Sequence, residues 1–344
     1  MTARYVYLLG PETVEMREFP APEPGEGELI LRVEAATTCG TDVKVYRRGG
    51  HPRMLQVPTP FGHEMAGVVA RVGAGVTSFR EGDRIVVSNS APCRRCEYCK
   101  VDRENLCRDL EYLNGAFADF VTVPARFVER ATYRLADSID AGVAAVTEPL
   151  ACVLHGIDAC SLAPNSTVLL FGAGPIGLLF VAALAADGHQ VVCADPNLSR
   201  LAVATQLGAS HTLEIERGGG QAERVLEESS VGLGFDCAVD ASGVPEVWLD
   251  AIAAVRPGGM VNLFGGCAPG TQIPLDTALV HYSELTIKGV YHHRPATVRR
   301  ALESLTDGSI DVTPILTSEA GLESTESALR SMIEKQNLKV VIRP

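Results

Sequence analysis

Four cysteines within fifteen residues are the part of this sequence best suited to chemistry. They follow the spacing C-x2-C-x2-C-x7-C and are Cys93, Cys96, Cys99 and Cys107. Thiolates this close together can close a tetrahedral shell around one metal ion, and a shell filled by four sulfurs leaves no position for a substrate. The alternatives are four unrelated thiols and an iron–sulfur cluster. The common bacterial cluster sequence places its fourth cysteine sooner and follows it with proline, whereas Arg108 follows here.

A glycine-rich segment, Gly172-Ala173-Gly174-Pro175-Ile176-Gly177, has the pattern G-x-G-x-x-G. It follows an expected strand and opens an expected helix, and Asp195 ends the next expected strand, which is the context of a dinucleotide site. The glycines allow a tight turn, a close approach of the pyrophosphate and helix packing, and the phosphates meet the helix N-terminus. Asp195 would accept both ribose hydroxyls and repel a 2′-phosphate, so NAD is expected rather than NADP. Arg200 either flanks the adenosine or is a solvated helix charge, and a glycine turn without ligand is the alternative for the segment.

A third group is dispersed along the chain. Cys39 lies in Cys39-Gly-Thr-Asp42, which we predict to be a strand-to-turn segment, His63 and Glu64 precede an expected strand, and Glu148 lies further on. Taken singly these residues are ordinary, because a lone cysteine is usually a small core residue.

The expected elements change in character along the chain. The first 150 residues contain short strand-like runs, such as 29–33, 67–72 and 84–87, separated by glycine and proline turns. From about Ser166 strands alternate with helices, which predicts a parallel sheet with helices on both faces. The expected strands are 167–171, 190–194, 235–239 and 260–264, and the expected helices are 175–186 and 199–207. About fifty residues of mixed character follow Gly289, and we expect them to return to the first domain.

Composition excludes several classes of protein. The 344 residues suffice for two domains, and 46% hydrophobic with 21% charged residues is the mixture of a soluble globular protein. The net charge of −12, without a basic run, argues against binding nucleic acid or an anionic membrane. Residues 1–10 lack the features of a signal peptide, and the apolar stretch 167–186 contains glycines and a proline, so it is better explained as strand, turn and helix than as a membrane span. The scattered remaining cysteines fit a reducing cytoplasm.

The motifs together resemble those of the zinc-containing medium-chain dehydrogenase/reductase family, in family order and over essentially the whole length. The resemblance rests on Cys39-Gly-Thr-Asp42, Gly62-His63-Glu64, the four-cysteine loop, Glu148-Pro149-Leu150 and the glycine-rich segment. The stretch from Glu148 to His155 resembles the sorbitol, polyol-phosphate and threonine dehydrogenase branch. Simple alcohol dehydrogenases carry a cysteine at the position of Glu148.

The resemblance implies a fold of two domains. A GroES-like, mostly-β catalytic domain would comprise residues 1–150 and 291–344. A Rossmann domain with a doubly wound parallel sheet, residues 151–290, would bind NAD. Relatives are commonly homodimers or homotetramers.

The resemblance also implies roles for the dispersed residues. Cys39 and His63 would ligate a catalytic zinc. Glu64 and Glu148 are the remaining candidate ligands: one would bind the zinc directly, and the other would bind through a water molecule or by exchanging with the first. Asp42 resembles the carboxylate that orients the ligand histidine, and Thr41 the hydroxyl that takes the alcohol proton. With the four-cysteine site this gives two zinc ions per chain. The candidate cofactor contacts are Gly172, Gly174, Pro175, Ile176, Gly177, Asp195, Arg200, Gly265, Val290 and His292.

One departure from the family concerns the proton. Relatives often have a histidine five residues after the zinc cysteine that passes the proton to solvent, and this chain has Lys44, which stays protonated near pH 7 and relays poorly. His51 is a possible substitute relay or an exposed loop histidine. Lys44 either holds a cofactor phosphate or is a surface charge. Arg47 and Arg48 either bind a phosphate or carboxylate of the substrate or are solvated. The segment Lys288–Arg294 resembles the one that passes beside the nicotinamide.

The sequence thus predicts a zinc- and NAD-dependent dehydrogenase that oxidises a secondary alcohol of a polyol or sugar-like substrate to the ketone, reversibly. A hydroxy amino acid such as threonine is the alternative substrate. Alternatives of another class are a zinc-free enone or quinone reductase and a non-catalytic nucleotide-binding descendant. The expected partners are a small polar alcohol or ketone and a second copy of the chain.

Overall fold

The computed structural model describes residues 2–51, 53–229 and 232–344, which divide into two compact units. The first unit comprises the described residues of Met1–Ala151, Arg294–Gly308 and Ile315–Pro344, and the second those of Cys152–His293 and Ser309–Pro314. Within the described part of the chain, we find no helix with the length and apolar character needed to cross a membrane. The mixed α/β fold class predicted from the sequence is confirmed.

The first unit is built mainly from antiparallel strands. Its largest sheet has the order β10-β6-β5-β3-β18-β17, with β9 also paired to β3, and a second sheet has the order β2-β1-β4. The strands are β1 (Thr2–Gly10), β2 (Thr13–Pro20), β3 (Leu29–Thr37), β4 (Thr59–Pro60), β5 (Glu64–Val72), β6 (Arg84–Val87), β7 (Ser90–Ala91), β8 (Glu111–Tyr112), β9 (Phe120–Val123), β10 (Thr132–Arg134), β17 (Leu316–Gly321) and β18 (Lys339–Arg343). The helices are α1 (Gly40–Arg48), α2 (Ala125–Arg130), α3 (Ala141–Ala145), α10 (Pro295–Asp307) and α11 (Thr325–Ile333), and α4 (Thr147–Cys160) runs from this unit into the second.

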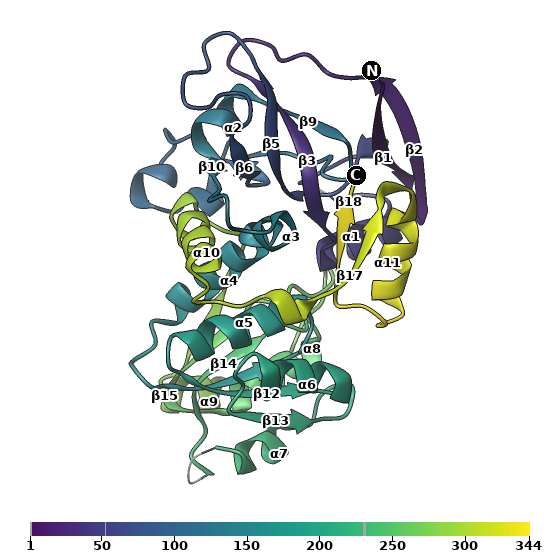
Figure 1. Ribbon diagram of the computed structural model, residues 1–344. Helices are drawn as coiled ribbons and strands as arrows, with labels where there is room; N and C mark the ends of the chain where they lie inside the picture. Colours follow the sequence, from purple (N-terminus) through teal and green to yellow (C-terminus); the bar gives the residue numbers. More distant parts are fainter. Residues whose placement is uncertain (1, 52, 230–231) are drawn as a thin grey trace. The chain divides into compact units, whose positions relative to one another are not determined.

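Strand β3 is the centre of this unit. Its residues are almost all buried, because β5, β9 and β18 pair with it and its apolar side chains pack in the core. Figure 1 shows the yellow C-terminal strand β18 beside the purple strand β3. The strand is longer than the predicted run 29–33, and β5 likewise begins at Glu64 rather than at Gly67. The extra length brings the ends of both strands to the candidate ligands.

The predicted strand-to-turn segment at Cys39 is wrong in its second part. After β3 ends at Thr37 the chain enters helix α1, for which Cys39 is the N-cap. Its sulfur accepts the N–H of Thr41, and Asp42 accepts the N–H of Cys39, which together form a capping box. This helix start was not predicted, because cysteine is not among the preferred cap residues.

The second unit is a six-stranded parallel sheet with the order β13-β12-β11-β14-β15-β16. The strands are β11 (Thr167–Phe171), β12 (Gln190–Asp195), β13 (His211–Glu214), β14 (Phe235–Asp240), β15 (Val255–Leu263) and β16 (Thr286–Gly289), and the helices are α5 (Pro175–Ala186), α6 (Leu198–Gln206), α7 (Ala222–Glu227), α8 (Pro245–Ala253) and α9 (Thr277–Tyr282). Helices α5 and α6 pack on β12, and α8 packs on β14 and β15 (Figure 1). The strand order reverses between β11 and β14, and in such sheets ligands bind at the carboxyl ends of the strands at this point.

Candidate functional site

The four-cysteine loop lies between β7 and β8 and contains two short 3-10 turns, Cys99–Val101 and Glu104–Leu106. The four sulfurs lie within 4.8 Å of one another. The measured separations are 4.0 Å for Cys93–Cys99, 3.5 Å for Cys96–Cys99 and 3.9 Å for Cys96–Cys107. A tetrahedral zinc–thiolate site with bonds of ~2.3 Å has edges of about 3.8 Å, so the loop fits such an ion without rearrangement.

Backbone N–H groups in this loop point at the sulfurs. The N–H groups of Arg95 and Cys96 donate to the sulfur of Cys93, and the N–H of Cys93 donates to that of Cys107. The N–H groups of Cys99 and Arg108 lower the pKa of Cys96 to about 6. Such donors favour the thiolate, which is the form that binds metal.

A second cluster brings together Cys39, His63 and Glu64, whose ligand atoms lie within 4.8 Å of one another. The pairing of β3 with β5 explains this proximity, because Thr37 is directly opposite Glu64. Cys39 follows two residues after Thr37, and His63 immediately precedes Glu64. All three side chains are buried.

Asp42 connects the helix cap to the histidine. One carboxylate oxygen accepts the N–H of Cys39 at 2.9 Å, and the other lies 2.9 Å from Nδ1 of His63. Burial alone would lower the pKa of His63, but the Asp42 carboxylate and a hydrogen bond to Cys39 outweigh it and hold that pKa well above its usual value. Because Nδ1 donates to Asp42, Nε2 is the nitrogen left to bind a metal.

The cation that faces Glu64 was not predicted from the sequence. Nζ of Lys339, on β18, forms a buried ion pair with Oε2 of Glu64 and donates to the carbonyl of Thr38 at 2.7 Å, and the Thr37 hydroxyl also donates to Oε2. Burial would lower the pKa of Lys339, but the Glu64 carboxylate raises it above its usual value. No signal near residues 39–64 could have indicated a partner 275 positions away.

The other oxygen of this carboxylate, Oε1 of Glu64, is buried without a hydrogen-bond partner among the described residues. A thiolate, an imidazole nitrogen and a carboxylate oxygen are the donors that zinc takes in proteins. The unsatisfied oxygen and the donor set therefore fit a metal ion with three protein ligands and an open position.

Glu148 has a different place. It is a buried residue in the first turn of α4, and its carboxylate does not lie within 4.8 Å of all three members of the Cys39 cluster. Thr41, in the first turn of α1, is half-buried and is held at the cluster by its N–H, 3.4 Å from the Cys39 sulfur.

The glycine-rich segment connects β11 to α5 in the second unit. Gly172 has φ = +97°, a conformation in the left-handed region that favours glycine. A side chain on Gly177 would clash with the Gly172 carbonyl, whereas Gly174 faces open space. Helix α5 begins at Pro175 without a side-chain cap. An uncapped helix start beside an open glycine fits the pyrophosphate of a dinucleotide.

Asp195 ends β12 beside this loop. One of its oxygens accepts the N–H of Ala173 at 2.7 Å and the other accepts that of Asn197 at 2.8 Å. Each carboxylate oxygen has a second lone pair, so both can still accept a ribose hydroxyl. Arg200 lies in the first turn of α6 with its backbone N–H on the Asn197 cap.

The remaining candidate cofactor residues lie at the ends of β15 and β16. Gly265 follows β15, and a side chain there would clash with the backbone N–H of Gly243. Val290 directly follows β16, and His292 has φ = +62° with its ring 4.0 Å from that of His293. Burial, together with the charge of His292, lowers the pKa of His293 well below its usual value.

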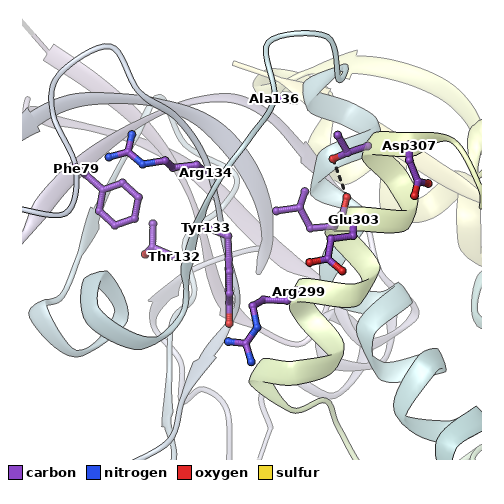
Figure 2. A pocket seen from close by; sticks show the side chains of 10 residues that line it. Phe79, Thr132, Tyr133, Arg134, Ala136, Arg299, Glu303 and Asp307 are labelled. Atoms are coloured by element: carbon purple, nitrogen blue, oxygen red, sulfur yellow. Dashed lines mark hydrogen bonds between the residues drawn. The ribbon is translucent and has the colours of Figure 1, made fainter.

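A hollow of about 670 Å³ in the first unit lies apart from both clusters (Figure 2). Its lining comes from β10, α10 and neighbouring loops, and includes Tyr133, Arg299, Glu303 and Asp307. Burial raises the pKa of Tyr133 to about 12, so this phenol is a poor acid or base at neutral pH. The lining contains no cysteine or histidine, and we place the chemistry at the clusters instead.

Known proteins match the chain over both units. The model of the alcohol dehydrogenase GroES-like domain matches residues 25–132, and that of the zinc-binding dehydrogenases matches residues 175–307.

Individual relatives cover nearly the whole chain. The sorbitol dehydrogenase of Bacillus subtilis is 31% identical, over 96% of this chain and 94% of that protein. The L-threonine 3-dehydrogenase of Idiomarina loihiensis is 31% identical, over 95% of each. A Sinorhizobium meliloti structure described as a zinc-binding dehydrogenase bound to NADP is 27% identical, covers 100% of both chains and has a TM-score of 0.90.

Proposed function

Since the chain belongs to the zinc-containing medium-chain dehydrogenase family and is therefore an oxidoreductase acting on CH–OH groups, we propose that it oxidises a secondary alcohol of a polyol or sugar-like substrate to the ketone, with NAD as acceptor. The observation that carries the proposal is the buried cluster of Cys39, His63 and Glu64, with one carboxylate oxygen unsatisfied. The similarity to a sorbitol dehydrogenase supports the substrate class.

Two metal sites follow from the residues. Cys39, His63 and Glu64 would hold the catalytic zinc, with Glu148 available on α4, and the four-cysteine loop would hold the structural zinc. A zinc ion with an open position supplies a Lewis acid that makes an alcohol oxygen easier to deprotonate.

The chain's own residues have distinct tasks in this reaction. The alcohol loses a hydride from carbon and a proton from oxygen. The half-buried Thr41 hydroxyl would accept that proton as it passes its own proton to solvent water. Asp42 accepts the Nδ1 hydrogen of His63, which fixes the direction of the ring and leaves Nε2 as the nitrogen that would bind the metal. Lys339 balances the charge of the buried Glu64 carboxylate.

The nicotinamide of NAD would take up the hydride, which adds two electrons to the ring. Asp195 supports NAD over NADP, because a carboxylate that accepts ribose hydroxyls would repel a 2′-phosphate at the same place. The NADP-bound relative makes this preference worth measuring directly.

A hydroxy amino acid is the second candidate substrate, favoured by the similarity to an L-threonine 3-dehydrogenase. An activity screen decides between the two. The purified chain with zinc is offered polyols, sugar phosphates and L-threonine with NAD or NADP, and reduced nicotinamide is followed by absorbance. We expect turnover with a polyol and a higher kcat/KM for NAD. Turnover with L-threonine alone would establish the alternative, and inactivity with every alcohol would contradict both.

A further inference from the structure

The geometry points to His51 as a specificity-determining residue, whose imidazole donates its Nε2 hydrogen to a hydroxyl oxygen of the substrate beyond the reacting carbon and carries no proton away from the alcohol. This inference rests on the proposed function, since it assigns a contact to the same substrate. It also replaces the relay role that the sequence suggested for this histidine.

The ring of His51 is fixed by its own loop. Its Nδ1 accepts the backbone N–H of Arg53 at 3.1 Å and that of Met54 at 3.0 Å, and its backbone N–H donates to the carbonyl of Leu55 at 3.0 Å. A neutral imidazole has one donor and one acceptor nitrogen. Because Nδ1 is the acceptor here, the hydrogen resides on Nε2. A second proton would have to be placed on Nδ1, against two N–H groups that already point at it.

The surrounding charges act in the same direction. Partial burial lowers the pKa of His51, and the charges of Arg53, Arg48 and His63 lower it further. These groups come from its own loop, the last turn of α1 and the segment before β5. His51 is therefore neutral near pH 7 and remains a donor, whereas a relay must gain and lose a proton.

The loop is tied to the catalytic cluster. The side chain of Asn114 donates to the carbonyl of Met54 at 2.9 Å, and the next residue, Gly115, donates its N–H to the carbonyl of Gly62 at 2.8 Å. Gly62 directly precedes His63. This chain of contacts ties the loop of His51 to the residue that precedes the candidate ligand His63.

A fixed neutral donor beside the reacting centre distinguishes substrates. A polyol presents hydroxyl oxygens on the carbons next to the one that reacts, and one of them can accept the Nε2 hydrogen. A monohydric alcohol has no such oxygen and leaves the donor unused. The contact would therefore favour polyols without taking part in the bond changes.

The kinetic test uses two replacements with the zinc- and NAD-loaded protein. The shorter amide of His51→Asn can still accept the loop N–H groups but has no donor at the Nε2 position, while His51→Gln places an amide N–H there. We expect the ratio of KM for sorbitol or xylitol to KM for 2-butanol to rise about tenfold in His51→Asn, the order of effect of a polar group that loses its partner, and to stay within about twofold in His51→Gln. The pH dependence of kcat should be the same in all three proteins. A lost or shifted basic limb in the variants would show a relay and overturn the inference.

A second measurement needs no substrate. Nitrogen-15 NMR of the histidine rings, with the His51 signal identified by its loss in His51→Gln, should show the Nε2–H tautomer from pH 6 to pH 8. A proton on Nδ1, or titration above pH 6.5, would overturn the inference even if no alcohol were turned over. Inactivity with every alcohol combined with the Nε2–H tautomer would instead contradict the proposed function, and with it the substrate contact.

Discussion

The two clusters of metal-ligand residues in the first unit are built in opposite ways. The four cysteines come from one loop of fifteen residues, and two of them are only half-buried. The Cys39 cluster combines residues from separate elements: Cys39 caps helix α1, His63 directly precedes β5, and Glu64 begins that strand. Lys339 of β18 pairs with Glu64, and all four side chains are buried. A local loop with four equal donors suits a closed site that stabilises structure. A non-local cluster with mixed donors and an unsatisfied oxygen suits an open site that reacts.

The largest expected effect tests which cluster performs the reaction. Cys39→Ser removes the thiolate of the open cluster, and we expect turnover to fall by more than the ~100-fold typical of losing an outer-shell partner. The far-ultraviolet circular dichroism and the affinity for NADH should not change. Cys267→Ser, the same chemical change outside both clusters, is the matched control. Activity of Cys39→Ser near that of the control would show that the reaction takes place elsewhere.

The buried ion pair of the open cluster should have the largest effect on stability. Lys339→Met leaves the Glu64 carboxylate without its cation, and breaking a buried pair in this way costs about 3–5 kcal/mol in the free energy of unfolding. Urea denaturation measures it, with Lys339→Arg as the variant that keeps the charge. The double variant Glu64→Gln with Lys339→Met should recover part of the loss. A cost below about 1 kcal/mol for Lys339→Met would mean that the pair does not balance a buried charge.

The closed cluster should show the reverse pattern. Cys96→Ser should release one of two zinc ions per chain and lower Tm by about 10 °C, because the loop loses the metal that orders it. The kcat of the molecules that remain folded should stay within about twofold. Metal analysis and calorimetry give the first two quantities, and active-site titration with NADH gives the third. Loss of kcat without loss of zinc would contradict the assignment of this cluster as structural.

Asp42 should give a smaller loss of activity than Cys39. Asp42→Asn keeps an acceptor for the helix cap but weakens the interaction with Nδ1 of His63, and such partners are typically worth 10–100-fold in metal affinity or activity. Asp276→Asn removes the N-cap carboxylate of helix α9 in the second unit and should leave kcat/KM unchanged. Equal effects of the two substitutions would reduce Asp42 to a helix cap.

The same contrast decides what the sequence could predict. The four cysteines and the glycine-rich segment are local patterns, and the structure places their members together as the spacing required. The parallel sheet was predicted from the alternation of strands and helices after about Ser166, which begins with the strand 167–171. Lys339 could not be found, because its contact with Glu64 depends on the pairing of β18 with β3. The role of Cys39 as a helix cap was also missed, because it depends on the sulfur accepting the N–H of Thr41, a contact that only the structure shows.

The placement of Lys339 has a consequence for how the protein matures. Glu64 leaves the ribosome 275 residues before Lys339, so during synthesis its carboxylate lacks the lysine with which it forms an ion pair in the folded protein. The four-cysteine loop has all its candidate ligands within residues 93–107 and can take its zinc while synthesis continues. We therefore expect the nascent protein to acquire its two ions in sequence, the structural one co-translationally and the catalytic one after β18 has joined the sheet.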